Sequence, residues 1–213
     1  MRPFYEHAGI TIWHSDWRDI PLSRADVLLT DPPYGIGEAA GKNKTRSMLA
    51  VSKDYGCSEW DSQPPSADDI EHLRRISRWQ MIWGGNYFHL PPSSCWLVWD
   101  KVNGANDFAD CELAWTNLEK AVRKYEYQWH GMLRQNPEKR FHPTQKPLAL
   151  MQWCLTHTPK AQSLLDPYMG SGTALVAAKL AGMTAVGCDR EERYCAIAAE
   201  RLGQEVFNFE ATA

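Results

Sequence analysis

The sequence predicts an α/β fold built on a largely parallel sheet. Short runs rich in β-branched and aromatic residues alternate with segments in which apolar residues recur at helical spacing. Most of the short runs are apolar throughout, as expected for strands that are covered on both faces. The chain has 213 residues, of which 44% are hydrophobic, and this favours a single domain with one core over residues 1–213.

Seven short runs are predicted to form strands. They are residues 10–13, 27–30, 80–83, 96–99, 112–115, 163–165 and 184–187. The tryptophans of the third and fourth runs are expected in the core, because large aromatic side chains are highly buried on average.

The first helix is predicted from a capping-box pattern. Ser66 is followed by Asp69, and an apolar repeat at helical spacing continues from there through Ile76 and Trp79. We therefore expect a helix that begins after Ser66 and reaches Trp79.

Three further helices are predicted in the second half of the chain. Pro147 suits the first turn of a helix that runs to Leu155. The alanine- and leucine-rich stretch after Gly172 is expected to end at Gly182, because glycine readily adopts the left-handed conformation that closes a helix. A last helix is expected over residues 191–202.

Two segments, residues 35–65 and 117–140, are not assigned to regular structure, and both overlap basic stretches. The net charge of the chain is −3, yet residues 38–53 hold four basic side chains against one acid, and residues 117–146 hold seven against three. Alone, each stretch is compatible with an ordinary solvated surface. Long irregular segments are usually functional or disordered, so the overlap favours contact with a polyanion.

Several classes of protein are disfavoured by the composition. No run approaches the roughly 18 apolar residues of a membrane span, and the first residues do not resemble a signal peptide, so we expect a cytoplasmic protein without a membrane partner. Six cysteines without a Cys-x-x-Cys pair predict neither a metal site nor a disulfide framework.

The first motif with chemical potential is the run from Asp31 to Tyr34, which follows an apolar strand directly. In open α/β sheets, ligands bind at the carboxyl ends of strands. The Asp31 carboxylate and the Pro32 carbonyl can accept the two hydrogens of an amino group on a planar base, which makes the nitrogen lone pair available. Tyr34 can stack on that base, while Pro32 and Pro33 hold the backbone. The alternative is an ordinary Asp-Pro turn.

The second motif is a Gly-x-Gly turn that joins a predicted strand to a helix. It comprises Asp166, Pro167, Tyr168, Gly170, Ser171, Gly172 and Thr173. Such a turn lets the backbone approach a ligand closely, and Asp189, at the end of the next strand, can hold a ribose diol. The glycine spacing differs from Gly-x-Gly-x-x-Gly, which disfavours a nicotinamide oxidoreductase. A tight turn beside a solvent-facing Asp189 is the structural alternative.

The third motif, residues 142–147, precedes a predicted helix. Lys146 and the backbone donors around it could bind a carboxylate, such as the methionine end of a cofactor. A proline-punctuated loop is the alternative interpretation.

With these motifs in this order, the chain resembles the β class of DNA amino-methyltransferases, the family that methylates adenine N6 or cytosine N4. The resemblance covers nearly the whole chain and includes Tyr194, Ala198 and the pair Arg201-Leu202 behind Asp189. It implies a mostly parallel, Rossmann-like sheet of the S-adenosylmethionine-dependent methyltransferases with a circularly permuted motif order. It also implies a short target-recognition insert at residues 117–140.

The resemblance implies roles for individual residues. The catalytic pocket around a flipped base would comprise Asp31, Pro32, Pro33 and Tyr34. The S-adenosylmethionine site would comprise Asp16, His142, Thr144, Gln145, Lys146, Asp166, Pro167, Tyr168, Gly170, Ser171, Gly172, Thr173 and Asp189. Phosphates of double-stranded DNA would be bound by Lys42, Lys44, Arg46, Arg123, Lys124, Arg134, Lys139 and Arg140. Asp16 occupies the place where relatives carry Gly-Asp near the cofactor adenine, but the preceding glycine is absent.

The implied reaction is site-specific methylation of adenine N6 in DNA, by base flipping and direct transfer. Asp-Pro-Pro-Tyr, rather than Ser-Pro-Pro-Tyr, resembles the adenine-specific form. Methylation of cytosine N4, methylation of adenine in RNA, and an inactive relative that only binds DNA remain open. Members of the family often pair, but the sequence does not decide between a monomer and a homodimer, nor whether a restriction enzyme accompanies the protein or a phage encodes it.

Overall fold

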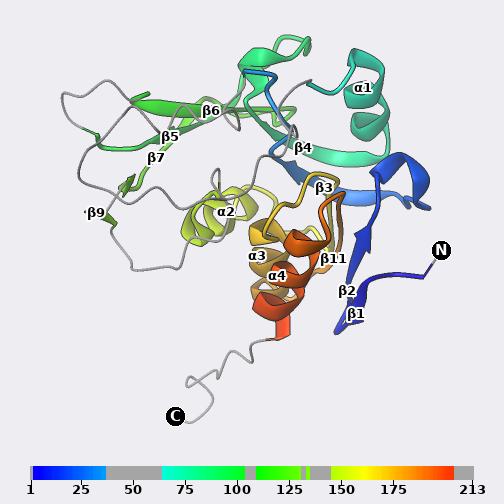
Figure 1. Cartoon of the computed structure of the whole chain (residues 1–213). Coiled ribbons are helices and arrows are strands. Elements are labelled where there is room, and N and C mark those ends of the chain that lie inside the picture. The colour runs from blue at the N-terminus through cyan, green and yellow to red at the C-terminus, as the bar shows by residue number, and fades with distance from the viewer. Residues whose placement is uncertain (1, 37–63, 104–108, 131–132, 135–144, 204–213) are drawn as a thin grey trace.

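The computed structural model describes residues 2–36, 64–103, 109–130, 133–134 and 145–203. Within these residues, nine strands form one sheet in the order β1-β2-β11-β10-β3-β4-β6-β5-β7 (Figure 1). The strands are β1 (Tyr5–His7), β2 (Ile10–His14), β3 (Ala25–Thr30), β4 (Ser77–Trp83), β5 (Trp96–Asp100), β6 (Cys111–Thr116), β7 (Arg123–Glu126), β10 (Ser163–Asp166) and β11 (Thr184–Asp189). A separate two-stranded ribbon pairs β8 (Trp129–His130) with β9 (Leu133–Arg134).

The centre of the sheet is parallel, as the sequence predicts. Strands β2, β11, β10, β3 and β4 run parallel to one another, whereas β1 pairs antiparallel with β2 and β6 pairs antiparallel with β4 and β5. All seven predicted strands are confirmed, and most extend one or more residues beyond the predicted limits.

Helices cover both faces of the sheet (Figure 1). Helices α2 (Leu148–Leu155), α3 (Thr173–Leu180) and α4 (Glu192–Gly203) pack on one face, and α1 (Ala67–Arg75) packs on the other together with the short 3-10 helix η1 (Trp17–Asp19). Because successive side chains of a strand point to opposite faces, Leu28 joins the core under α1 while Leu29 joins the core under α2. Both leucines are fully buried, which explains the continuous apolar run of β3.

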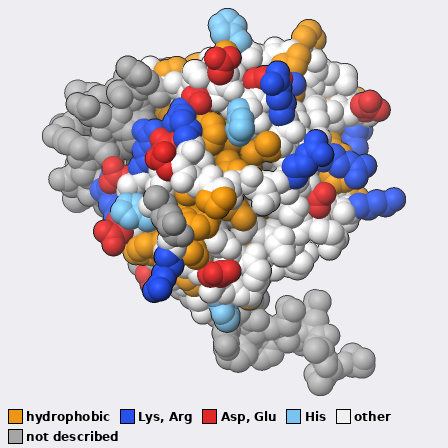
Figure 2. Space-filling view, turned by 90° about the vertical axis from the view of Figure 1, so that its right-hand side faces the viewer, with side chains coloured by type: hydrophobic (Ala, Val, Ile, Leu, Met, Phe, Trp, Pro, Cys, Tyr) orange, Lys and Arg blue, Asp and Glu red, His pale blue; other side chains and the backbone are white. Residues whose placement is uncertain are grey.

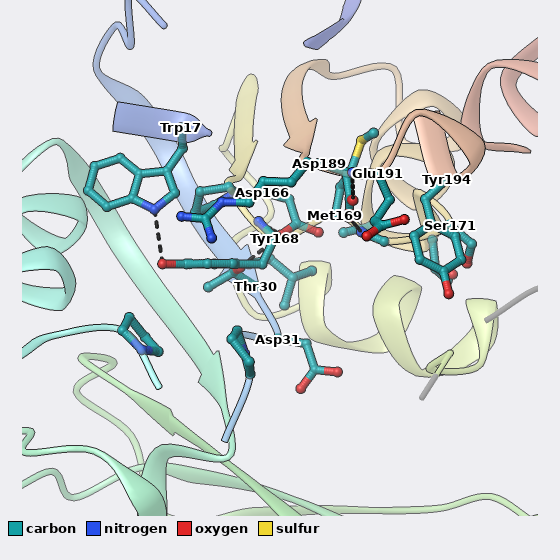
Figure 3. Close-up of a pocket in the computed structure, with 18 of the residues that line it drawn as sticks. Trp17, Thr30, Asp31, Asp166, Tyr168, Met169, Ser171, Asp189, Glu191 and Tyr194 are labelled. Carbon is teal, nitrogen blue, oxygen red and sulfur yellow. Dashed lines mark hydrogen bonds between the residues drawn. The ribbon is translucent and has the colours of Figure 1, made fainter. Parts of the chain in front are cut away.

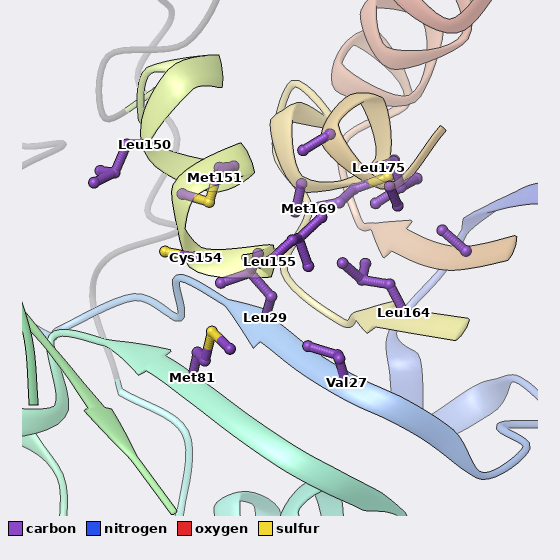
Figure 4. Close-up of a cluster of buried hydrophobic side chains, with 14 of the residues drawn as sticks. Val27, Leu29, Met81, Leu150, Met151, Cys154, Leu155, Leu164, Met169 and Leu175 are labelled. Atoms are coloured by element: carbon purple, nitrogen blue, oxygen red, sulfur yellow. The ribbon is translucent and has the colours of Figure 1, made fainter. Parts of the chain in front are cut away.

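The larger core lies between the parallel strands and helices α2 and α3 (Figure 4). Val27 and Leu29 of β3 and Met81 of β4 face Leu155 of α2 there. The tryptophans of β4, β5 and β6, at positions 83, 99 and 115, are each at most 2% exposed, which confirms a core role for Trp83 and Trp99, while Trp96 is only partly buried.

Two predictions about secondary structure are wrong. Helix α1 ends at Arg75 rather than continuing through Trp79, because Ser77 already begins β4 and Trp79 lies opposite Val27 of β3. Where a helix passes directly into a strand, the apolar residues at the junction fit the spacing of either element. Pairing with β3 decides that residues 77–79 belong to the strand.

The segment 117–140 is not wholly irregular. Residues 123–126 form β7, which pairs parallel with β5 at the edge of the sheet, and β8 and β9 follow it. Charged, exposed residues are common on edge strands because they discourage pairing with other chains, and here they conceal the strand pattern.

The remaining helix predictions are confirmed in outline. Ser66 and Asp69 form the reciprocal capping box at the start of α1. Pro147 stands just before the first residue of α2, Gly182 has a φ of +70°, and α4 lies within one residue of its predicted limits. Most of the segment 35–65 lies outside the described residues. Among the described helices, none has the length and apolar character needed to cross a membrane.

Candidate active site

The two predicted ligand-binding turns lie side by side. Strand β10 pairs parallel with β3, so Asp166, the last residue of β10, and Asp31, the first residue after β3, lie at the carboxyl ends of neighbouring strands. The Thr30 hydroxyl donates a hydrogen bond of 2.7 Å to Asp166 Oδ1 and links the two strand ends. A cavity of about 490 Å³, within the usual size range of ligand pockets, opens there (Figure 3).

Most of the described residues that the sequence assigns to the site line this cavity. They are Asp16, Asp31, Pro33, Gln145, Lys146, Asp166, Pro167, Tyr168, Gly170, Ser171, Thr173 and Asp189. Pro32, Tyr34 and Gly172 do not line the cavity but are next in the chain to residues that do, whereas His142 and Thr144 are outside the described residues. Sequence reasoning missed the cavity roles of Trp17, Arg18 and Arg190, for which only their closeness to Asp16 and Asp189 in the chain was a signal.

Close packing against α4 fixes the glycine turn beside the cavity. Gly172 has a φ of +75°, and a Cβ there would lie 2.7 Å from the Ala198 Cβ of α4. Arg201 of α4 donates to the Ser171 carbonyl oxygen at 2.7 Å and to Thr173 Oγ1 at 3.0 Å. The turn therefore depends on contacts with α4 to keep its backbone beside the cavity.

Asp189 occupies the end of β11 and accepts two backbone hydrogen bonds. The Gly170 N–H donates to Oδ2 at 3.1 Å, and the Glu191 N–H donates to Oδ1 at 2.8 Å. Burial raises the pKa of Asp189 to about 6, although these two bonds oppose the shift. Each carboxylate oxygen retains acceptor capacity, which suits a pair of hydroxyl donors such as a ribose diol.

Asp166 is the second buried acid of the cavity, at 5% exposure. Its Oδ1 accepts from the Thr30 hydroxyl and from the Tyr168 N–H at 3.2 Å. Burial raises the pKa of Asp166 to about 7, and the nearby Asp31 and Asp189 carboxylates add to the shift.

An aromatic and charged wall closes the side of the cavity near β2. Trp17 Nε1 donates to the Tyr168 hydroxyl at 2.9 Å (Figure 3). Asp16 caps η1 by accepting from the Arg18 N–H at 2.9 Å, and its carboxylate forms ion pairs with Arg18 and Arg190. Burial would raise the pKa of Asp16, but these donors hold it below its usual value. Asp16 thus lines the cavity and is paired with both Arg18 and Arg190.

Tyr34 and Lys146 hold the Asp31 carboxylate from its two oxygens. The Tyr34 hydroxyl donates to Asp31 Oδ1 at 2.5 Å, and the Lys146 ammonium lies 2.6 Å from Asp31 Oδ2. The ring of Tyr34 stacks on Tyr87, with centroids 4.9 Å apart. Gly84 makes this position possible, because a Cβ there would come within 2.1 Å of the Tyr34 ring.

Lys146 contacts two acids, Asp31 and Glu112. Besides Asp31, it lies 3.0 Å from Glu112 Oε2 on β6, and Glu112 Oε1 pairs with Lys101 at 2.6 Å. Burial opposes ionisation of Asp31, Glu112 and Lys146, but the opposite charges nearby outweigh burial for Lys146 and Glu112. They hold the pKa of Lys146 above its usual range and lower the pKa of Glu112 to about 2. For Asp31, burial outweighs the lysine and the pKa is raised. The sequence carried no signal for Glu112 beyond its place on a strand.

The predicted DNA-binding residues are only partly described. Arg123 and Lys124 are exposed on β7, where Lys124 pairs with Glu126 at 2.6 Å and Asp100 at 3.3 Å. The side chain of Arg134 and the residues Lys42, Lys44, Arg46, Lys139 and Arg140 are outside the description. On the face shown in Figure 2, basic, acidic and hydrophobic side chains are interspersed.

The fold is that of the Rossmann-like, S-adenosylmethionine-dependent methyltransferases. A family model described as DNA methylase, the N6/N4 methyltransferase family, matches residues 80–200, which is more than half of the chain. The chain belongs to this family.

Two curated relatives match along nearly their full length. The Type II methyltransferase M2.LlaDCHI of Lactococcus lactis subsp. cremoris is 26% identical, with 95% of this chain and 93% of the relative covered. The Type II methyltransferase M2.DpnII of Streptococcus pneumoniae is also 26% identical, with 96% and 93% covered.

Solved structures share the fold. The structure of M1.HpyAVI in complex with SAM is similar with a TM-score of 0.55 at 22% identity, covering 92% of this chain and 100% of that one. The cytosine-N4-specific PvuII DNA methyltransferase has a TM-score of 0.55 at 11% identity, covering 95% and 89%. At these identities the likeness concerns the fold alone.

Proposed function

We propose that this protein transfers a methyl group from S-adenosylmethionine to the exocyclic N6 of adenine in double-stranded DNA. The observation that carries the proposal is the placement of Asp31 and the glycine turn at the ends of the neighbouring strands β3 and β10. A planar base bound at Asp31 and a nucleoside bound at the glycine turn would meet within one cavity. Membership of the DNA methylase family supports the same chemistry.

The residues of the cavity fit the proposed cofactor. Asp189 offers acceptors for ribose hydroxyls, and the turn from Gly170 to Gly172 brings backbone close to the cavity without side-chain bulk. The Trp17–Tyr168 pair supplies an apolar wall. When bound, S-adenosylmethionine supplies an electrophilic methyl group on a sulfonium.

Asp31 and the Pro32 carbonyl are proposed to accept the two amino hydrogens of the flipped base. This removes the nitrogen lone pair from conjugation and turns it toward the methyl donor. Tyr34, braced by Tyr87, would stack on the base and exclude water from one side. Within the described residues no cysteine lines the cavity, which agrees with direct transfer rather than a covalent enzyme intermediate.

The segment 117–140 is proposed to serve as a short target-recognition insert of a single methyltransferase domain. Its basic residues, Arg123 and Lys124 among them, would bind phosphates and orient the duplex. The ion pairs of Lys124 with Asp100 and Glu126 are exposed, and such pairs are weak enough to be exchanged for phosphate. Sequencing of DNA modified in a methylation-free host would test the insert, because a short insert predicts a short or degenerate site.

Replacing the proposed acceptor tests the function directly. Asp31→Ala should lower methyl incorporation into duplex DNA by at least about 10²-fold, the usual effect of removing one pre-organised polar contact from a transition state. Asp68→Ala, an exposed acid in the first turn of α1, is the matched control and should retain wild-type activity. Activity near wild type in Asp31→Ala would refute the role.

Mass analysis of nucleosides from digested product DNA identifies the methylated base. We expect N6-methyladenine. N4-methylcytosine would correct the base while leaving the site intact, and methylation of RNA alone would overturn the proposed substrate. Cofactor binding without any transfer would indicate an inactive DNA-binding relative.

A further inference from the structure

Lys146 joins the catalytic turn to strand β6. It is separated from Asp31 by 115 residues in the chain, yet its ammonium lies 2.6 Å from Asp31 Oδ2 and 3.4 Å from the Tyr34 hydroxyl. Only 6% of its side chain is exposed. A buried ammonium with two acid partners is a costly feature for a fold to retain without a use.

We propose that Lys146 is a positioning residue for Asp31: held between Asp31 and Glu112, it keeps the Asp31 carboxylate oriented and anionic as the acceptor of the base's amino hydrogens. This inference rests on the proposed function of Asp31. It assigns Lys146 to the base side of the cavity rather than to the carboxylate of the cofactor.

A nearby cation keeps the Asp31 carboxylate ionised. A carboxylate accepts with both oxygens, whereas a protonated carboxyl group converts one of them into a donor. Burial and the Glu112 carboxylate favour protonation of Asp31, and the Tyr34 hydroxyl opposes it by hydrogen bonding. Among the described groups that face Asp31, Lys146 is the cation in contact with it.

Glu112 holds Lys146 from the opposite side. It lies 3.0 Å from the ammonium and is itself paired with Lys101 at 2.6 Å. The ring of Trp83 lies 5.7 Å from the same ammonium and contributes a cation–π contact. The lysine is therefore fixed from β4 and β6 at the point where it contacts Asp31.

Two substitutions should shift the pKa of Asp31 in opposite directions, which separates this role from a merely structural one. Lys146→Met removes the cation, so the pKa of Asp31 should rise by about one to three pH units. Glu112→Gln removes a negative charge that favours protonation and leaves Lys146 to Asp31 alone, so the same pKa should fall. General loosening of the site would move both variants in one direction.

The measurement is a ¹³C-carboxyl NMR titration of the free protein, with the Asp31 resonance assigned by its loss in Asp31→Asn. Because no turnover is needed, the result can be read even if the wild type fails to methylate adenine. Lys160→Met, an exposed lysine after α2, is the matched control and should leave the titration unchanged. If Lys146→Met does not fold, the double variant Lys146→Met/Glu112→Gln removes one charge of each sign, and its Asp31 pKa should lie above that of Glu112→Gln alone.

Cofactor binding and the pH profile complete the test. Calorimetric titration with S-adenosylmethionine should give dissociation constants for Lys146→Met and wild type within about threefold, a small change on the free-energy scale. The acid limb of methyl transfer should move to higher pH in Lys146→Met. An unchanged Asp31 titration would overturn the proposal. So would a tenfold or greater loss of cofactor affinity with an unchanged acid limb, because that result would place Lys146 on the cofactor carboxylate.

Discussion

At the scale of single residues, the site depends on positions where a side chain has no room. Gly84 follows β4 with a φ of +67°, a left-handed conformation that costs other residues about 1–2 kcal/mol. The ring that fills the space above it belongs to Tyr34, which hydrogen bonds to Asp31. A glycine on one strand end therefore determines the position of an aromatic ring on another.

Gly84→Ala is expected to lower methyl transfer by roughly 10²-fold, the effect of displacing a reacting group by about 1 Å. The added Cβ would force the Tyr34 ring away from Asp31 and Tyr87. Gly182→Ala is the matched control, because Gly182 has a φ of +70° but open space around its Cβ position. Gly182→Ala should lose about 1 kcal/mol of unfolding free energy from backbone strain, Gly84→Ala should lose more because of the added clash with Tyr34, and only Gly84→Ala should lose activity. Equal activities in steady-state assays would contradict the role of Gly84.

At the scale of elements, one residue of helix α1, Asp69, takes part in both a local cap and a tertiary contact. Asp69 completes the capping box by accepting from the Ser66 N–H at 3.1 Å, and it also forms an ion pair with Arg18 beside the cavity. The hydrogen bond from Arg18, its strongest influence, lowers the pKa of Asp69 and outweighs burial, which would raise it. The start of α1 thus braces the wall that carries Trp17 and Arg18.

Ser66→Ala should lower the unfolding free energy by about 1 kcal/mol, because the Asp69 N–H loses its side-chain acceptor. Ser66→Asp restores an acceptor and should stay within a few tenths of a kcal/mol of wild type. Urea denaturation at neutral pH measures both. A similar loss in both variants would show that the missing side-chain acceptor is not the cause of the destabilisation.

At the scale of the whole molecule, the buried acids of the cavity link stability to pH. Burial raises the pKa of Asp166 to about 7 and that of Asp189 to about 6. Between their usual values and these values, the folded state binds protons that the unfolded state has released, so stability falls as pH rises through this window. Glu112, with a pKa of about 2, acts at lower pH in the opposite sense.

The melting temperature of the cofactor-free protein should therefore fall between about pH 5 and pH 8, and Asp166→Asn should reduce that fall. An asparagine Oδ1 can still accept from the Thr30 hydroxyl and the Tyr168 N–H, so both hydrogen bonds can be retained in Asp166→Asn. Calorimetric melts at several pH values measure the slopes. Asp68→Asn, at an exposed position, should leave the slope unchanged, and an unchanged slope in Asp166→Asn would contradict the prediction.

Features set by neighbouring residues in the chain were predicted correctly, whereas features set by contacts between distant segments were not. The capping box at Ser66, the left-handed Gly182 and the apolar run of β3 depend on neighbours in the chain, and all three were predictable. The end of α1 and the edge strand β7 depend on pairing with β3 and β5, and both were mispredicted.

The sequence by itself determined the fold class, the positions of the two predicted ligand-binding turns and the family, because each is carried by contiguous residues whose chemistry is local. Only the tertiary structure decided that β10 lies beside β3 and that Lys146 reaches Asp31 and Glu112. Strand order and buried ion pairs join residues that are far apart in the chain. Their energies depend on distance and burial in space, and neither quantity can be read from neighbouring letters.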